Sequence, residues 1–238
     1  MEKIAALLRL GKRGDKLTAD MRRDIDQALQ GVMERTFLMR GISLIGRCAD
    51  YALVGTRVLR AITGEPYQAR AGGGVLDCGE GRYLLITPSR SALRKAMDLQ
   101  DLDEYHCWIE CRHPRPHGPW RTEHIDFTLR YDEAVAQLFG QPFVTEGREA
   151  FYWGFEDERP PLPLQLRNHS LFQGRRGGWL WSMPDCQRLL NKYAARHAAL
   201  FDKLATEVLL DLAILRSDQN PTPARTKDGS EDQEARMR

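Results

Sequence analysis

Three residue types that can carry out nucleophilic catalysis occur along the chain in the order Cys48, His106 and Asp126. A cysteine thiolate attacks a carbonyl carbon, and a histidine accepts the thiol proton and later returns a proton to the leaving group. A carboxylate orients the imidazole and stabilises its charged form. We therefore take these three residues as a candidate catalytic triad that would act on an amide or ester through a thioester.

A helix is predicted to place the cysteine. The segment from Cys48 to about Ile62 is largely apolar, as in a buried helix, and Gly64-Glu65-Pro66 would end it. The first turn of a helix has unpaired backbone N–H groups and the positive end of the helix dipole. A thiolate is stabilised there, so the pKa of the cysteine falls. The same N–H groups can hold the oxyanion of a tetrahedral intermediate.

Two strands are predicted to place the other two residues. Residues 105–111 contain His106, residues 123–130 contain Asp126, and the loop at 113–119 has three prolines and a glycine. Adjacent strands would bring the two side chains together although 20 residues separate them in sequence. Because side chains alternate along a strand, one face should carry His106, Trp108 and Glu110, and the other Cys107, Ile109 and Cys111.

The remaining segments predict helices on both sides of a strand-rich middle. The expected helices are a short basic one in 1–16, one from the N-cap Thr18 to about Leu38, and others at 91–99, 132–139 and 185–216. The expected strands are 67–71, 75–77 and 83–87, and the glycines at 72–74 would allow a bend or a close backbone approach. This order predicts an α+β fold rather than repeated βαβ units.

These motifs resemble the transglutaminase-like, papain-like cysteine enzyme superfamily. The likeness rests on Cys48 opening a helix, on His106-Cys107-Trp108-Ile109-Glu110, on Asp126-Phe127-Thr128 and on the passage Gly64–Arg70, and it covers about 41–130. The motif order also resembles that of lasso-peptide leader peptidases, and we expect a bacterial branch. The resemblance implies a Cys-bearing helix packed on a small antiparallel sheet, the triad above, supporting roles for Trp108, Glu110 and Thr128, and no cofactor.

The chain departs from the family pattern at several points. Cys107 occupies the position between His and Trp where members commonly carry a small residue, and the Arg-Gly-Gly-x-Cys motif of arylamine acetyltransferases is absent. No glutamine or asparagine upstream of Cys48 can be assigned as an oxyanion donor. The oxyanion hole is therefore expected to use backbone N–H groups, including that of Cys48 itself.

Composition limits the broad class of the protein. The 238 residues carry a net charge of +2 and are 42% hydrophobic, a balance that does not favour nucleic-acid or membrane binding. The beginning of the chain lacks a signal-peptide pattern, and the five cysteines are an odd number, so we expect a cytoplasmic protein with free thiols. The expected organisation is a helical extension at 1–40, a catalytic domain at 41–216 with an irregular elaboration at 140–184, and a disordered tail at 217–238.

Several alternatives remain open. Hydrolysis of a peptide or isopeptide-like bond in a peptide or protein substrate is the first choice, with acyl transfer to an amine or a non-catalytic binding module as alternatives. His124 could replace His106 as the base, and Asn168-His169 could form a papain-like pair. A zinc site is another possibility, since five zinc-binding side chains fall within twelve residues: His106, Cys107, Cys111, His113 and His117. Their alternation along a strand argues against one shared site. The oligomeric state cannot be read from the sequence.

Overall fold

The computed structural model describes residues 17–115, 118–172 and 178–219, and within them the fold is α+β. Seven α-helices accompany one six-stranded antiparallel sheet, which confirms the predicted fold class. The sheet order is β2-β1-β3-β4-β5, and β6 pairs with β1. The strands are β1 Gln68–Gly79, β2 Arg82–Ile86, β3 His106–His113, β4 Arg121–Asp126, β5 Tyr152–Phe155 and β6 Leu180–Ser182.

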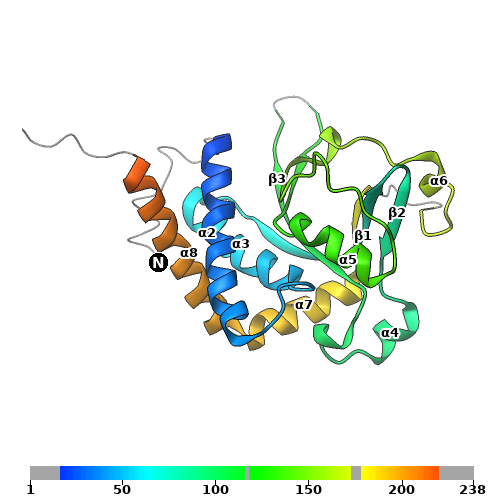
Figure 1. The fold of residues 1–238 in the computed structure, drawn as a ribbon, viewed down its shortest axis with the longest axis horizontal. Coiled ribbons are helices and arrows are strands. Elements are labelled where there is room, and N and C mark those ends of the chain that lie inside the picture. Colours follow the sequence, from blue (N-terminus) through cyan, green and yellow to red (C-terminus); the bar gives the residue numbers. More distant parts are fainter. Residues whose placement is uncertain (1–16, 116–117, 173–177, 220–238) are drawn as a thin grey trace, which may run out of the picture.

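The long helices gather on one side of the strands, whereas the short helix α6 (Leu164–Arg167) lies on the opposite side of the view, near β2 (Figure 1). The long ones, which share a core with the strands, are α2 Ala19–Phe37, α3 Cys48–Thr63, α7 Pro184–Arg196 and α8 Ala198–Gln219. The short ones are α4 Arg90–Lys95, α5 Asp132–Leu138 and α6 Leu164–Arg167. None of the helices within the described residues is long and apolar enough to cross a membrane.

Helix α3, which carries the cysteine, packs directly on β1 and β3, as predicted. Most of its residues are buried, and it ends at Gly64, whose φ of 72° suits a residue without a side chain. The close approach to the sheet depends on Gly55. A Cβ at that position would lie 2.8 Å from Ile109 Cδ1 and 3.0 Å from a ring carbon of Phe127.

Strand β1 continues through the three glycines, so the predicted short strand at 67–71 was too short and there is no bend at 72–74. The glycines instead allow a close backbone approach by β6. A Cβ on Gly72 would lie 2.0 Å from the Trp181 carbonyl oxygen, and one on Gly73 would lie 2.3 Å from the Trp181 ring. Strand β6 pairs with β1 at this point, Gly72 opposite Ser182.

Two predictions for the second half of the chain were wrong. The segment 140–184 is not merely an elaboration, because it contributes β5 and β6 to the sheet. The single helix expected at 185–216 is two helices, α7 and α8, which are separated at His197.

Smaller differences concern element ends. The strand expected at 123–130 ends at Asp126, and the helix expected at 91–99 ends at Lys95. Helix α8 continues to Gln219, so the predicted disordered tail cannot begin at 217. The helix predicted within 1–16 and the tail from 220 onwards lie outside the described residues.

Candidate active site

Cys48 is the first residue of α3, and its side chain is almost fully buried. The preceding residue, Arg47, makes no side-chain cap to the helix. A first turn without a side-chain cap leaves backbone N–H groups that have no partner within the helix. The predicted position of Cys48 at the start of the helix is confirmed.

His106 and Asp126 meet across β3 and β4. His106 is the first residue of β3 and Asp126 is the last of β4, and the strands pair in register with Ile109 opposite Ile125. The Nε2 atom of His106 lies 2.6 Å from Oδ2 of Asp126. The other carboxylate oxygen accepts hydrogen bonds from the Thr128 backbone N–H at 2.9 Å and hydroxyl at 2.7 Å. Thr128 thus fixes the carboxylate that holds the imidazole.

The thiol and the imidazole interact in a way that favours charge separation. The largest influence on the pKa of Cys48 is a hydrogen bond with Cys107, which lowers it. Burial raises this pKa, whereas a hydrogen bond with His106 and the positive charge of that residue lower it. The pKa of Cys48 is lowered to about 6 as a result. For His106, burial is the largest influence and lowers the pKa, but Asp126 and Cys48 together raise it well above its usual value. Both shifts favour the thiolate form of Cys48 and the imidazolium form of His106.

A cavity of about 330 Å³ opens on these three residues. Its walls are mostly apolar and come from β1, β2, α5 and residues at 152–160 and 179–180. Volumes of this order suit a small ligand or a single substrate side chain. The polar and aromatic side chains that also line it are Asp77, Tyr105, Asp132, Arg148, Tyr152, Arg159 and Trp179.

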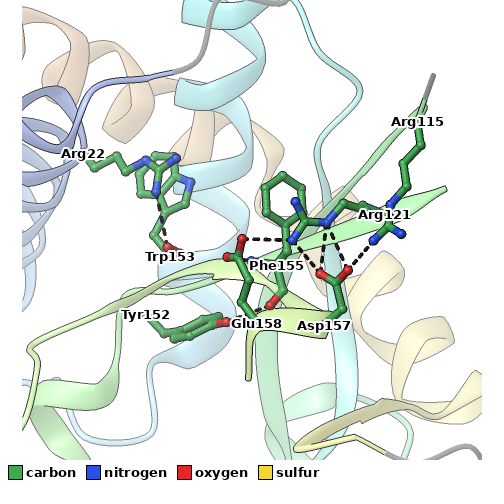
Figure 2. A network of polar contacts seen from close by, with 8 residues as sticks. All are labelled: Arg22, Arg115, Arg121, Tyr152, Trp153, Phe155, Asp157 and Glu158. Atoms are coloured by element: carbon green, nitrogen blue, oxygen red, sulfur yellow. Dashed lines mark hydrogen bonds and ion pairs between the residues drawn. The ribbon is translucent and has the colours of Figure 1, made fainter. Parts of the chain in front are cut away.

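A network of polar contacts fixes the segment that carries Tyr152 and Arg159 (Figure 2). The Arg121 guanidinium binds Asp157 through two nitrogens, at 2.7 and 3.0 Å, and binds Glu158 at 2.9 Å. It also lies 3.7 Å from the centre of the Phe155 ring. Arg121 begins β4, so the same strand supplies the candidate triad carboxylate, Asp126, at one end and anchors the cavity wall at the other.

Two predicted supporting residues lie beside the triad without lining the cavity. The Trp108 ring stacks on that of His106, with 6.3 Å between centroids, and its indole N–H donates to Glu110 at 2.9 Å. Trp108 is buried, so its ring packs against the imidazole while its N–H is directed to Glu110. Glu110 also forms an ion pair with Arg70 at 2.9 Å, so its contacts are structural.

The alternative residues are placed elsewhere. His124 shares a sheet face with Asp126, but its Nε2 faces Glu110 at 3.5 Å and it does not line the triad cavity. Asn168 and His169 follow α6 and are not part of the cavity either. His117 lies outside the described residues, and in the part of the chain that the structure does describe, no group of three or more His, Cys, Asp and Glu is arranged to hold a metal ion.

Sequence reasoning missed the role of Cys107 and the charged residues of the cavity. Cys107 is on the strand face opposite His106, yet it influences Cys48 through a hydrogen bond, and burial first of all keeps its own pKa high. The departure from the family pattern at this position was the only sequence signal.

Comparison of the chain with protein-family models, with curated proteins and with solved structures finds no match. The chemistry that the site can perform must therefore be argued from the residues that form it.

Proposed function

We propose that the protein is a cysteine-nucleophile amide or peptide hydrolase with a transglutaminase-like, papain-like catalytic core. The observations that carry the proposal are the hydrogen bond between Asp126 and His106, the electrostatic influence of His106 and Cys48 on each other's pKa, and the position of all three residues at the wall of a largely apolar cavity. Thiol catalysis requires a carboxylate for the imidazole, an imidazole for the thiol and N–H groups for an oxyanion, and the proposal assigns these roles to Asp126, His106 and the first turn of α3.

The proposed reaction begins with attack of the Cys48 thiolate on a carbonyl carbon. The first-turn N–H groups of α3 hold the oxyanion while the imidazolium of His106 donates its proton to the leaving amine. A thioester remains on the sulfur. Neutral His106 then removes a proton from water, the resulting hydroxide attacks the thioester, and the acid leaves as the thiolate is restored. Asp126 stays ionised throughout and holds the ring.

Alkylation kinetics test the activated thiol. Native protein is treated with iodoacetamide from pH 5 to 9, and each cysteine is quantified by mass spectrometry. We expect Cys48 to react faster than the other four and at lower pH, and His106→Ala to slow this labelling. The matched control is His113→Gln, since His113 also faces a carboxylate, that of Glu123 at 3.1 Å, but lies outside the cavity. Equal, slow labelling of all five cysteines would refute the triad.

Acylation with an activated ester distinguishes the two catalytic alternatives. Incubation with p-nitrophenyl acetate should place an acetyl group on Cys48, which intact-protein mass spectrometry detects and Cys48→Ala abolishes. The acetyl-enzyme is then incubated with glycine amide. If the acetyl group is released as acetate, the protein is a hydrolase, and if it is released as acetylated glycine amide, the protein is an acyltransferase. If Cys48 reacts with iodoacetamide but never acquires the acetyl group, the protein is a binding module instead.

A further inference from the structure

Asp132 is the one cavity carboxylate that the described structure leaves without a contact partner. Asp126 is held by His106 and Thr128, and Asp77 accepts the Gly79 N–H at 2.8 Å and faces Arg148 at 3.5 Å. Asp132, the first residue of α5, is half-buried in the cavity wall. Within the described residues it accepts no hydrogen bond and forms no ion pair.

The surroundings of Asp132 disfavour a negative charge in the empty cavity. Burial is the main cause that raises its pKa to about 7, and the charge of Asp126 adds to it. His106, Arg148 and Arg159 act in the opposite direction with smaller effects. A carboxylate left near an apolar wall without a partner costs free energy, and a bound cation recovers that cost.

The two arginines of the cavity, unlike Asp132, are held by contacts of their own. Arg148 faces Asp77 and lies 5.3 Å from the centre of the Phe143 ring. Arg159 stacks on the Tyr152 ring at 3.7 Å, and within the described residues its buried Nε has no hydrogen-bond partner. A cationic ligand group would therefore find a carboxylate without a partner, whereas an anionic group near Arg159 would also meet the charge of Asp132, and near Arg148 it would compete with Asp77.

We infer that Asp132 is a specificity residue that binds a cationic group of the substrate, an ammonium or guanidinium as in a lysine or arginine side chain, beside Cys48. This inference rests on the proposed function, because it makes the cavity the place where the substrate is recognised. It also gives a substrate class: peptides or amides that carry a basic side chain near the bond to be cleaved.

Charged thiol reagents test this recognition. Methanethiosulfonates that carry an ammonium, a methyl or a sulfonate group are reacted with Cys48 at pH 8. To correct for the intrinsic reactivity of each reagent, its rate constant with Cys48 is divided by its rate constant with glutathione. The ammonium reagent should exceed the sulfonate reagent by about tenfold or more. Asp132→Asn should remove most of that ratio. Glu133→Gln, which removes an exposed carboxylate on the same helix outside the cavity, should retain it.

The outcomes separate the inference from the function on which it rests. A normal rate with the neutral methyl reagent but no ammonium preference would overturn the role of Asp132, and a sulfonate preference would assign recognition to the arginines. A slow reaction with the neutral reagent would refute the activated thiol instead.

A second measurement needs no reactive cysteine. The Asp132 carboxyl carbon is titrated by NMR with and without butylammonium, using butanol as the control and the Asp132→Asn spectrum for assignment. Butylammonium should lower the Asp132 pKa, because a bound cation favours the carboxylate. An unchanged titration curve would overturn the inference.

Discussion

The Nε2 atom of His106 lies 2.6 Å from the Oδ2 atom of Asp126, and both side chains are largely enclosed by protein. This contact assigns the two ring nitrogens of the histidine. With Nε2 directed to the carboxylate, Nδ1 is the nitrogen left for Cys48. The carboxylate therefore selects the tautomer and the ring orientation that a thiol nucleophile needs.

Replacing Asp126 with Asn should lower the rate at which the acetyl group leaves Cys48, and the turnover of any substrate, by ~10²–10⁴-fold. The reason is that an amide neither stabilises the imidazolium of His106 nor enforces its tautomer. The measurement is the rate of acyl-enzyme decay by intact mass. Glu110→Gln is the control, since Glu110 lies on the same sheet face but binds Arg70 and Trp108 outside the cavity. An equal loss in both variants would mean that the sheet, and not the triad, had been damaged.

The pH dependence of Cys48 alkylation should have its midpoint at about 6. Alkylation requires the thiolate, so a lowered pKa means that the rate rises at lower pH than for an ordinary cysteine, whose pKa is about 8.5. Cys107→Ala removes the hydrogen bond with the largest effect, so the pKa of Cys48 rises and the midpoint moves to higher pH. Cys111→Ala, a buried cysteine on the same strand face, should leave the midpoint in place. Identical midpoints in all three proteins would contradict this role of Cys107.

The parts of the site that local sequence signals define were predictable. An apolar segment after Cys48, closed by Gly64, predicted α3 from its first residue. The strands around His106 and Asp126 were found because each has apolar positions and a proline-rich loop separates them. Once both strands are placed, antiparallel pairing brings the two side chains together, and the structure has this contact.

The cavity could not be predicted, because its walls come from short segments whose placement depends on long-range contacts. Strands β5 and β6 have four and three residues, too few for a periodic pattern. Their positions are set by Arg121 at one side and by the small size of Gly72 at the other. Helices α7 and α8 were joined in the prediction because the apolar spacing continues across His197 without a proline or glycine.

Replacing Arg121 with Gln should loosen the wall that carries Tyr152 and Arg159. The substitution removes the paired contacts to Asp157 and Glu158 and the stacking on Phe155. Amide hydrogen exchange in residues 152–159 should become faster, while the melting temperature changes little because the contacts are exposed. Arg82→Gln is the control, since Arg82 pairs with Glu80 inside its own hairpin. Unchanged exchange would show that β5 pairing with β4 holds the segment alone.

The last prediction concerns Gly72, whose missing side chain allows β6 to join the sheet. In Gly72→Ala the new Cβ would meet the Trp181 carbonyl oxygen at 2.0 Å, a backbone contact that only a shift of β6 can relieve. We expect a loss of about 1–3 kcal/mol of folding free energy. Activity should fall further, because displacement of β6 moves Leu180 and the cavity wall next to it.

Denaturant unfolding and acyl-enzyme formation measure the two effects separately. Gly74→Ala is the matched control two residues along the same strand. There the nearest atom to a new Cβ is the flexible Leu180 Cδ2 at 3.2 Å, so a small side-chain movement accommodates it and stability should change much less. If the two variants unfold at the same denaturant concentration, backbone contact with β6 does not explain the glycine at position 72.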